Sequence, residues 1–198
     1  MTPVPARWNP ARQVVAVAAV LLVVGGLAGC AGEPAPARTA EPTAEATAEP
    51  IFASDEEALA AAVEAYEAYN AEAARISTNP AVEPSSIANF VSEGFVAQSV
   101  QEFELLRQEG VTLVGEMKLL DPELVMWSTT NGAAHATIYV CLDVSGVRVV
   151  NSSGADVTAA DRQEVVPQQA EFISSSSAPS VLLVDRIDQW SGADFCSR

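Results

Sequence analysis

The 198-residue sequence predicts an α+β domain in which helices come first and an antiparallel sheet follows. Three observations lead to this prediction. Apolar residues recur at helical spacing between residues 54 and 76, and after Gly110 the apolar period changes from about 3.6 residues to about 2. The stretch AAHATIYVCLDV then alternates between residues that would lie on opposite faces of a strand. We therefore expect a helical half followed by a sheet-forming half.

Residues 1–29 have the layout of a secretory signal peptide. Arg7 and Arg12 are their only charged residues, and an apolar run follows over residues 14–27. This run is shorter than the roughly 20 apolar residues of a membrane-spanning helix. Residues 27–30, Leu-Ala-Gly-Cys, resemble the lipobox of bacterial lipoproteins.

The lipobox resemblance implies that a diacylglycerol is attached to the Cys30 thiol and that the signal is cleaved just before it. Cys30 would then be the first mature residue and would anchor the protein to the outer face of the cell membrane. Two alternatives are an ordinary secreted protein with a chance cysteine near its cleavage site and an uncleaved signal anchor. Gly25, Gly26 and Gly29 would weaken the helix of such an anchor.

The number of cysteines fits the lipidated form. The chain has three, and an odd cysteine in an exported protein needs an explanation. If Cys30 is used as a thioether, Cys141 and Cys196 remain as a pair that can form a disulfide outside the cytoplasm. Closing that loop of 55 residues would stabilise the fold by about 4 kcal/mol in the chain-entropy description. The alternative is two reduced, buried thiols.

A Pro-, Ala-, Glu- and Thr-rich segment separates Cys30 from the domain. Residues 31–53 have almost nothing to bury, which is typical of a semi-extended tether with a reach of up to about 70 Å. All 26 acidic residues lie after the signal peptide, whose loss would change the formal net charge from −16 to about −18. With Lys118 as the only lysine, this charge disfavours binding to nucleic acid. Residues 54–198 are the size of one domain.

The first predicted helix covers residues 54–76. A capping box formed by Ser54 and Glu57 starts it, and an acidic first turn suits the positive end of its dipole. We expect its core-facing residues to be Leu59, Val63, Tyr66, Tyr69, Ala73 and Ile76.

Two further helices are predicted before the sheet. A short one runs from residue 85 or 86 to about residue 92, and Gly94 interrupts the chain after it. The next covers residues 97–109 and ends at Gly110. We expect its inward residues to be Val100, Phe103, Leu105 and Leu106.

The remaining sequence predicts antiparallel strands. Residues 111–120 alternate between two faces, and Asp121-Pro122 separates them from a strand over residues 123–130. Asn131-Gly132 is a strong hairpin signal. The clearest strand has an apolar face of Ala134, Ala136, Ile138, Val140 and Leu142, and a second face of His135, Thr137, Tyr139, Cys141 and Asp143. Further strands are expected over residues 146–158, 164–174 and 180–190, with a serine-rich turn at residues 174–177.

The order of these elements resembles that of exported members of the nuclear transport factor 2-like superfamily, which also contains SnoaL-type cyclases and ketosteroid isomerase. The resemblance lies in the glycine-ended third helix before a long sheet, and in the strand YVCLDVSGVRVV paired with a terminal WSGADFC. It covers Ser54 to Cys196 and implies a cone-shaped fold, with N-terminal helices packed on a curved antiparallel sheet. The tail from Trp190 to Cys196 is also similar to that of lipoproteins of unassigned function, which implies a disulfide between Cys141 and Cys196.

No set of residues predicts catalysis. Ketosteroid isomerase uses a carboxylate base beside a tyrosine and a protonated aspartic acid, and no positions here match these three roles. The carboxylates nearest the strand centres are Asp143, Asp185 and Asp188. Tyr139 and Asp143 share the polar face of their strand, so we expect them to point away from a pocket under the helices. His135, the only histidine, is favoured as a hydrogen-bonded strand residue over a proton-transfer group.

Cofactor and metal sites are not predicted either. One histidine and two oxidised cysteines do not suffice for a typical zinc site. The spacing of Asp156 and Asp161 does not fit an EF-hand loop, so we interpret them as solvated turn residues. The sequence has no phosphate-binding glycine motif and no nucleophile motif.

Several large apolar residues are candidates for the lining of an apolar pocket at the wide end of the cone, although core packing explains such residues more often. They are Phe90, Phe103, Met126 and Trp127, together with Phe95.

Three functions are consistent with these observations. The favoured one is a non-enzymatic lipoprotein that binds a protein partner or a small apolar ligand. The second is an enzyme of the SnoaL or ketosteroid isomerase type that acts on a small hydrophobic substrate. The third is an assembly factor that forms a homodimer through the open face of its sheet.

Overall fold

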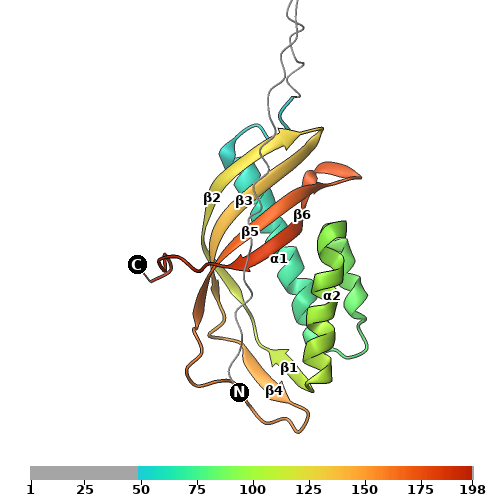
Figure 1. Ribbon diagram of the computed structural model, residues 1–198, viewed down its shortest axis with the longest axis vertical. Helices are drawn as coiled ribbons and strands as arrows, with labels where there is room; N and C mark the ends of the chain where they lie inside the picture. Colours follow the sequence, from blue (N-terminus) through green and yellow to red (C-terminus); the bar gives the residue numbers. More distant parts are fainter. Residues whose placement is uncertain (1–48, 198) are drawn as a thin grey trace, which may run out of the picture. The chain divides into compact units, whose positions relative to one another are not determined.

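The computed structural model describes residues 49–197, which form an α+β domain with the helices before the strands, as predicted (Figure 1). The helices are α1 (Asp55–Thr78), the short 3₁₀ helix η1 (Pro84–Asn89) and α2 (Glu93–Gln108). The strands are β1 (Val111–Val114), β2 (Lys118–Thr130), β3 (Ala133–Asp143), β4 (Arg148–Asn151), β5 (Val165–Ser175) and β6 (Ala178–Gln189). The predicted signal peptide, Cys30 and most of the predicted tether lie outside the described residues.

The predicted capping box starts α1. Ser54 Oγ accepts a hydrogen bond from the Glu57 N–H at 3.3 Å, and Glu57 Oε2 accepts one from the Ala53 N–H at 2.7 Å. These bonds satisfy backbone donors that have no partner within the helix. The acidic first turn lies at the positive end of the helix dipole, where negative charge is stabilising.

Alanines, more than the predicted large residues, form the buried face of α1. Tyr66, Ala73 and Ile76 are buried as expected. Leu59, Val63 and Tyr69 are only half-buried. The other buried residues of this helix are Ala58, Ala62, Ala65 and Glu72. Small side chains let α1 approach the sheet closely, so the alanine face turns inward and the larger residues flank it.

The helix α2 begins earlier than predicted, at Glu93, and Gly94 lies in its first turn. A glycine is costly mainly in the interior of a helix, and Gly94 lies at the N-terminal end of this one. The buried face runs through Phe95, Ser99 and Phe103 at steps of four residues, whereas Leu105 is 48 % exposed. The prediction that Leu105 points inward was therefore wrong.

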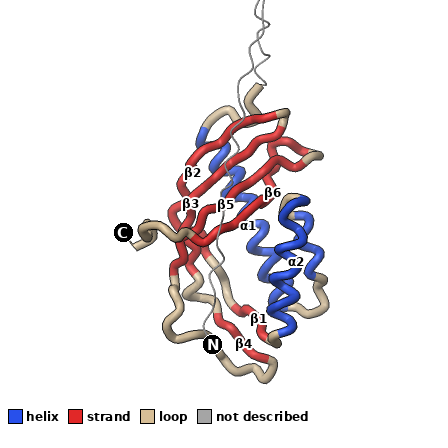
Figure 2. The backbone as a smooth tube through the Cα atoms, in the orientation of Figure 1, coloured by secondary structure: helices blue, strands red, loops and turns tan. Residues whose placement is uncertain are grey.

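Two antiparallel sheets follow the helices. β2, β3, β5 and β6 form a four-stranded sheet in that order, and β1 pairs only with β4 in a separate two-stranded sheet (Figure 2). The predicted Asn131-Gly132 turn joins β2 to β3, with φ values of 53° and 78°. A two-residue turn with two positive φ values suits the twist of a hairpin.

The long strand β2 contradicts the predicted break at Asp121-Pro122. Its pairing with β3 shifts register between Leu120 and Glu123, and Asp121 takes a positive φ of 48°. A bulge of this kind accommodates proline, which has no N–H to contribute to the ladder, and β2 is an edge strand where this is tolerated.

The predicted continuous strand over residues 111–120 is also wrong. β1 ends at Val114, and Gly115 follows with a φ of 122°. A Cβ placed on Gly115 would lie 2.0 Å from the carbonyl oxygen of Gly146. The backbones therefore touch where the chain leaves the small sheet for the large one.

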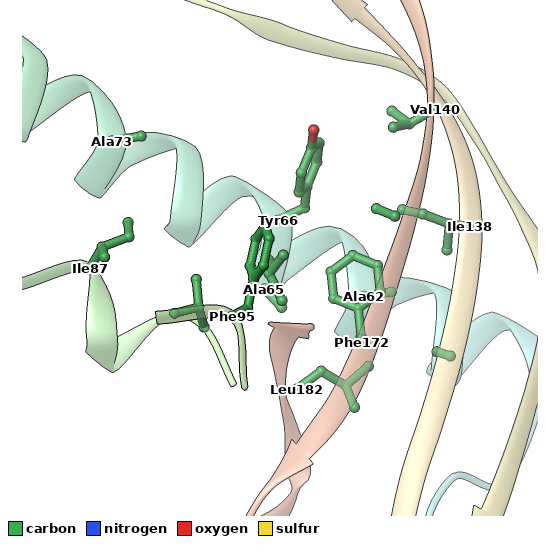
Figure 3. Close-up of a cluster of buried hydrophobic side chains, with 14 of the residues drawn as sticks. Ala62, Ala65, Tyr66, Ala73, Ile87, Phe95, Ile138, Val140, Phe172 and Leu182 are labelled. Atoms are coloured by element: carbon green, nitrogen blue, oxygen red, sulfur yellow. The ribbon is translucent and has the colours of Figure 1, made fainter. Parts of the chain in front are cut away.

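The core lies between α1 and the large sheet. The predicted apolar face of β3 is buried against it, and Figure 3 shows Ile138, Phe172 and Leu182 of the sheet near Ala62 and Ala65 of α1. α1 contacts β2, β3 and β6, while α2 packs beside it against η1, β1 and β6.

The edge strand β6 is partly covered by the connection between η1 and α2. Val91 forms a parallel bridge with Val184. The Ser92 N–H donates to the Val184 carbonyl at 2.8 Å, and the Val184 N–H donates to the Phe90 carbonyl at 3.1 Å. Beyond this bridge, β6 continues toward the β5–β6 turn without a neighbouring strand on this side among the described residues.

The C-terminal tail packs on the face of the sheet that is turned away from α1. Tyr139 lies 5.0 Å from the ring of Trp190 and 5.3 Å from that of Phe195, and a disulfide joins Cys141 to Cys196. Tyr139 and Cys141 alternate along β3 with the buried core residues, which places them on the opposite face. The structure thus contains the disulfide that the number of cysteines predicts.

Candidate functional site

A cavity of about 270 Å³ lies between the two helices and the sheets, and we call it the inner cavity. Its lining combines apolar side chains with a few polar ones. The lining residues are Tyr66, Tyr69, Asn70, Ala73, Ser77, Phe95, Glu102, Phe103, Leu106, Leu113, Met117, Leu142, Gln168 and Ile187. Its volume is close to the lower end of the range that small-molecule sites usually have.

Tyr66 is the deepest polar residue of the inner cavity. Its side chain is 1 % exposed, and its ring meets that of Phe172 edge to face at 6.3 Å. The Tyr66 hydroxyl donates a hydrogen bond to Gln168 Oε1. Burial, and secondarily the neighbouring Tyr69, raise the pKa of Tyr66 above its usual value, because the charged phenolate would lose its hydration. Tyr66 is therefore a neutral phenol at physiological pH.

Tyr69 stacks on Tyr66 one helical turn further along α1. The two rings are nearly parallel, at 7°, with centroids 6.1 Å apart. Burial, and then the negative charge of Glu102, raise the pKa of Tyr69 to about 12. Both phenols can donate or accept hydrogen bonds, but neither is poised to act as a base.

Glu102 supplies the carboxylate that lines this cavity. It is exposed and accepts a hydrogen bond from Gln98 Nε2 at 3.1 Å, so it lies at the rim. The amide of Asn70 contributes a second polar group, and its nitrogen is buried without an acceptor among the described residues. The polar groups of the cavity are thus neutral inside and acidic at the edge.

Two larger hollows adjoin the inner cavity. One of about 630 Å³ shares Asn70 and Met117 with it and extends over Glu116 and Lys118. The other, of about 350 Å³, shares Phe103 with the inner cavity and extends along the end of α2 toward β1. The cavity is therefore bordered on two sides by depressions through which a ligand could enter.

The structure does not bring the predicted pocket residues together. Phe103 and Phe95 line the inner cavity. Phe90 lines a separate pocket of about 220 Å³ between α1 and β6. Met126 is 60 % exposed on the face of β2 turned away from α1, opposite Thr137 of β3. The candidate residues Phe90, Phe103, Met126 and Trp127 therefore do not line one common pocket.

Trp127 packs at the start of α1 instead. Its ring meets that of Phe52 at 5.7 Å in an edge-to-face contact, and its Nε1–H donates to Asp55 Oδ1 at 2.8 Å. Met126 and Trp127 are neighbours on a strand, and neighbouring strand residues face opposite sides of the sheet. This alternation along β2 explains why the side chains of Met126 and Trp127 lie on opposite faces of the sheet.

The polar cavity residues were missed by the sequence analysis. Tyr66, Tyr69 and Ala73 follow the predicted helical spacing, and that spacing by itself indicates a stripe that faces the core. The helical period places Tyr66, Tyr69 and Asn70 on adjacent parts of one face of α1. Polar side chains within an otherwise apolar face are a pattern that could have suggested a cavity there. Gln168 had no local signal, because only the pairing of β5 with β3 and β6 brings it under α1.

The strand carboxylates and the histidine do not line the inner cavity. Tyr139 contacts the C-terminal tail, in agreement with the prediction that it points away from the helices. Asp188 pairs with Arg186 at 2.5 Å on an exposed part of β6. His135 is exposed on β3, opposite Ile173 of β5.

No helix within residues 49–197 is long and apolar enough to cross a membrane. Within the same residues, no three His, Cys, Asp or Glu side chains are grouped so that they could hold a metal ion. Cys30, the predicted lipidation site, lies outside this part.

Comparison with known proteins assigns no family. No family model matches the chain, and no curated protein matches it. Among solved structures, the chain is similar to the intermembrane space region of the chloroplast protein ARC6, with 9% identity, a TM-score of 0.48, and coverage of 68% of this chain and 97% of that one. It is also similar to a de novo designed β-sheet protein, with 15% identity, a TM-score of 0.29, and coverage of 70% and 89%. Both TM-scores lie below 0.5, so neither likeness assigns a fold or a function.

Proposed function

We propose that this chain is a lipid-anchored lipoprotein of the outer face of the cell membrane, and that its domain binds a small apolar molecule in the inner cavity. The observation that carries the binding proposal is the lining of that cavity. Apolar residues such as Phe95, Phe103 and Leu106 surround two neutral phenols. Binding sites for small molecules typically combine mostly apolar walls with a few placed polar groups.

The same proposal includes a nuclear transport factor 2-like fold. Two features support it. The helices α1 and α2 precede the antiparallel strands, and the inner cavity lies between those helices and the sheets. A lipoprotein signal ending at Cys30 is supported by the Leu-Ala-Gly-Cys sequence at residues 27–30.

A binding role is favoured over catalysis because the cavity lacks a suitably placed base. The Tyr66 hydroxyl is already engaged with Gln168, and the raised pKa of Tyr69 keeps its phenol protonated. Glu102 is exposed at the rim of the cavity, where its carboxylate accepts a hydrogen bond from Gln98.

Cavity binding can be tested with 1-aminoanthracene, an uncharged apolar dye whose fluorescence rises in apolar surroundings. We expect one molecule of dye to bind per chain. Leu106→Trp should abolish binding because the indole would fill the cavity. Leu105→Trp is the matched control, because it adds the same side chain at the exposed neighbouring position of α2. Equal binding by the two variants would contradict the proposal.

The lipid anchor has an independent test. Intact-mass analysis of the mature wild-type protein should show a diacylglycerol at Cys30, and Cys30→Ser should leave the protein as an uncleaved precursor or in the medium. A wild-type protein that is soluble and unmodified would contradict this part of the proposal.

The homodimer through the open sheet face stays a prediction, which measurement of the mass in solution would test.

An enzyme of the SnoaL or ketosteroid isomerase type is the alternative, and one observation favours it. Tyr66, Tyr69 and Glu102 line one cavity, and a phenol beside a carboxylate can stabilise an enolate while the carboxylate moves a proton. The test is conversion of a β,γ-unsaturated cyclic ketone to its conjugated isomer, followed by ultraviolet absorbance. We expect no conversion above buffer. Conversion that Glu102→Gln abolishes would replace the binding proposal with this one.

A further inference from the structure

The pocket between α1 and β6 lies where another strand would continue the sheet. Val184 directs its N–H and C=O away from β5, because both are bonded to the connection at Phe90 and Ser92. Backbone groups of an antiparallel strand alternate between its two sides, and the register is continuous from Val184 to Leu182. The N–H and C=O of Leu182 therefore point to the same side as those of Val184.

No backbone partner covers Leu182 on that side within residues 49–197. The segment that bridges Val184 does not extend as far as Leu182, because Asn89 already belongs to η1. The pocket of about 220 Å³ begins at this point, and β6 forms one of its walls. The unpaired N–H and C=O of Leu182 thus face this hollow and not open solvent, because Leu182 as a whole is only 3 % exposed.

Opposite the strand edge, the pocket has an apolar floor. Ala61, Ala65 and Ala68 of α1 line it, and their small side chains leave room for a larger one. Phe90 lines the same pocket, and Val181 of β6 is 52 % exposed beside it. An open backbone edge beside an apolar hollow is the arrangement by which proteins bind extended peptides as an added strand.

The charge of this surface indicates the kind of peptide. Glu64 is the charged residue that lines the pocket, and the whole chain carries a formal net charge of −16. An acidic segment, including a second copy of this acidic chain, would be repelled, whereas a basic segment would be attracted.

We propose that the edge of β6 at Leu182 binds an extended segment of a basic partner protein. The segment adds its backbone to β6, places an apolar side chain in the pocket, and pairs a flanking arginine or lysine with Glu64. This site is separate from the inner cavity and does not depend on ligand binding there.

The experiment measures the fluorescence anisotropy of labelled peptides with the full-length chain. The probe is Arg-Val-Thr-Val-Thr-Val-Arg, and the charge control replaces both arginines by glutamate. A third peptide has the basic sequence with alternate backbone nitrogens methylated, which removes the hydrogen bonds of one edge. We expect the basic peptide to bind about tenfold more tightly than either of the other two.

Two variants locate the site. Ala61→Trp should weaken binding of the basic peptide by about tenfold because the indole fills the pocket, while Ala60→Trp, at the exposed neighbouring position, should leave binding within about twofold. Glu64→Lys changes the net charge only from −16 to −14, so it should reduce the preference for the basic over the acidic peptide severalfold without reversing it. This variant gives an answer even if Ala61→Trp does not fold. Absence of binding by the basic peptide overturns the proposal. So does equal binding by the methylated peptide, or equal effects of the two tryptophan variants.

Discussion

The disulfide between Cys141 and Cys196 should contribute a large part of the stability of this domain. It closes a loop of 55 residues that contains β4, β5 and β6. In the chain-entropy description, a loop of that length removes about 14 cal/mol/K from the unfolded chain, which is about 4 kcal/mol at 25 °C. Single domains are stable by only about 5–15 kcal/mol. Loss of this one bond should therefore remove a substantial fraction of the free energy of unfolding.

The perturbation of choice is Cys196→Ser in a Cys30→Ser background, so that no third thiol can exchange. It leaves the Cys141 thiol in place, which is 4 % exposed and can stay buried as a small apolar group. With a urea dependence of about 2 kcal/mol per molar, the unfolding midpoint followed by circular dichroism should fall by about 2 M. A reductant should shift the Cys30→Ser parent to the same midpoint and leave the Cys196→Ser variant unchanged. A shift below about 0.5 M would refute this reasoning.

Two further outcomes concern the tyrosines and the tail. Because the pKa of Tyr69 is raised to about 12 and that of Tyr66 is also raised, the folded state holds phenolic protons that the unfolded state releases near pH 10. These two groups should therefore leave the free energy of unfolding unchanged below pH 10 and lower it between pH 10 and pH 12. In urea titrations, Tyr69→Phe should show a smaller decrease of the free energy of unfolding over this pH range. In the tail, a Cβ on Gly192 would lie 2.5 Å from Trp190 Nε1. Gly192→Ala should therefore displace the indole of Trp190 and shift the tryptophan emission to longer wavelength. It should also lower the free energy of unfolding by about 1 kcal/mol. The control is Gly94→Ala, whose Cβ would meet nothing closer than 3.8 Å and which should leave emission unchanged.

Local signals predicted the parts of the fold that local chemistry determines. Ser54 and Glu57 start α1 because their side chains satisfy nearby backbone donors. Asn131-Gly132 forms the hairpin because both residues accept a positive φ. The alternation along β3 gave the correct buried face because it depends only on the period of a strand.

Predictions failed where distant residues decide the structure. The rule that larger apolar residues face the core pointed to Leu59 and Val63, but close packing of α1 on the sheet favours its alanines. The split between β1 and β2 depends on the contact of Gly115 with Gly146, more than thirty residues away in the chain.

In the candidate site too, local sequence signals predicted some features, and contacts between distant residues determine the others. Tyr66 and Tyr69 were correctly placed on the inner face of the first helix, although Tyr69 is only half-buried. Their role as cavity lining depends on Gln168 and Leu113, which the pairing of distant strands brings to α1. A linear sequence gives no direct sign of how far two elements stand apart, and that separation determines whether an inward face fills a core or borders a cavity.

The contact between Gly115 and Gly146 has a consequence for how this sequence can diverge. Position 115 cannot gain a side chain, because its φ is 122° and a Cβ there would overlap the backbone of residue 146 whatever residue stands at that position. A Cβ on Gly146 would lie 3.1 Å from the carbonyl oxygen of Glu116, a close contact that a small shift relieves. Among proteins that share this fold, we expect the glycine at position 115 to be kept, while position 146 is free to vary. Gly115 can therefore serve as a marker for relatives that retain the architecture when overall sequence identity is too low to reveal them.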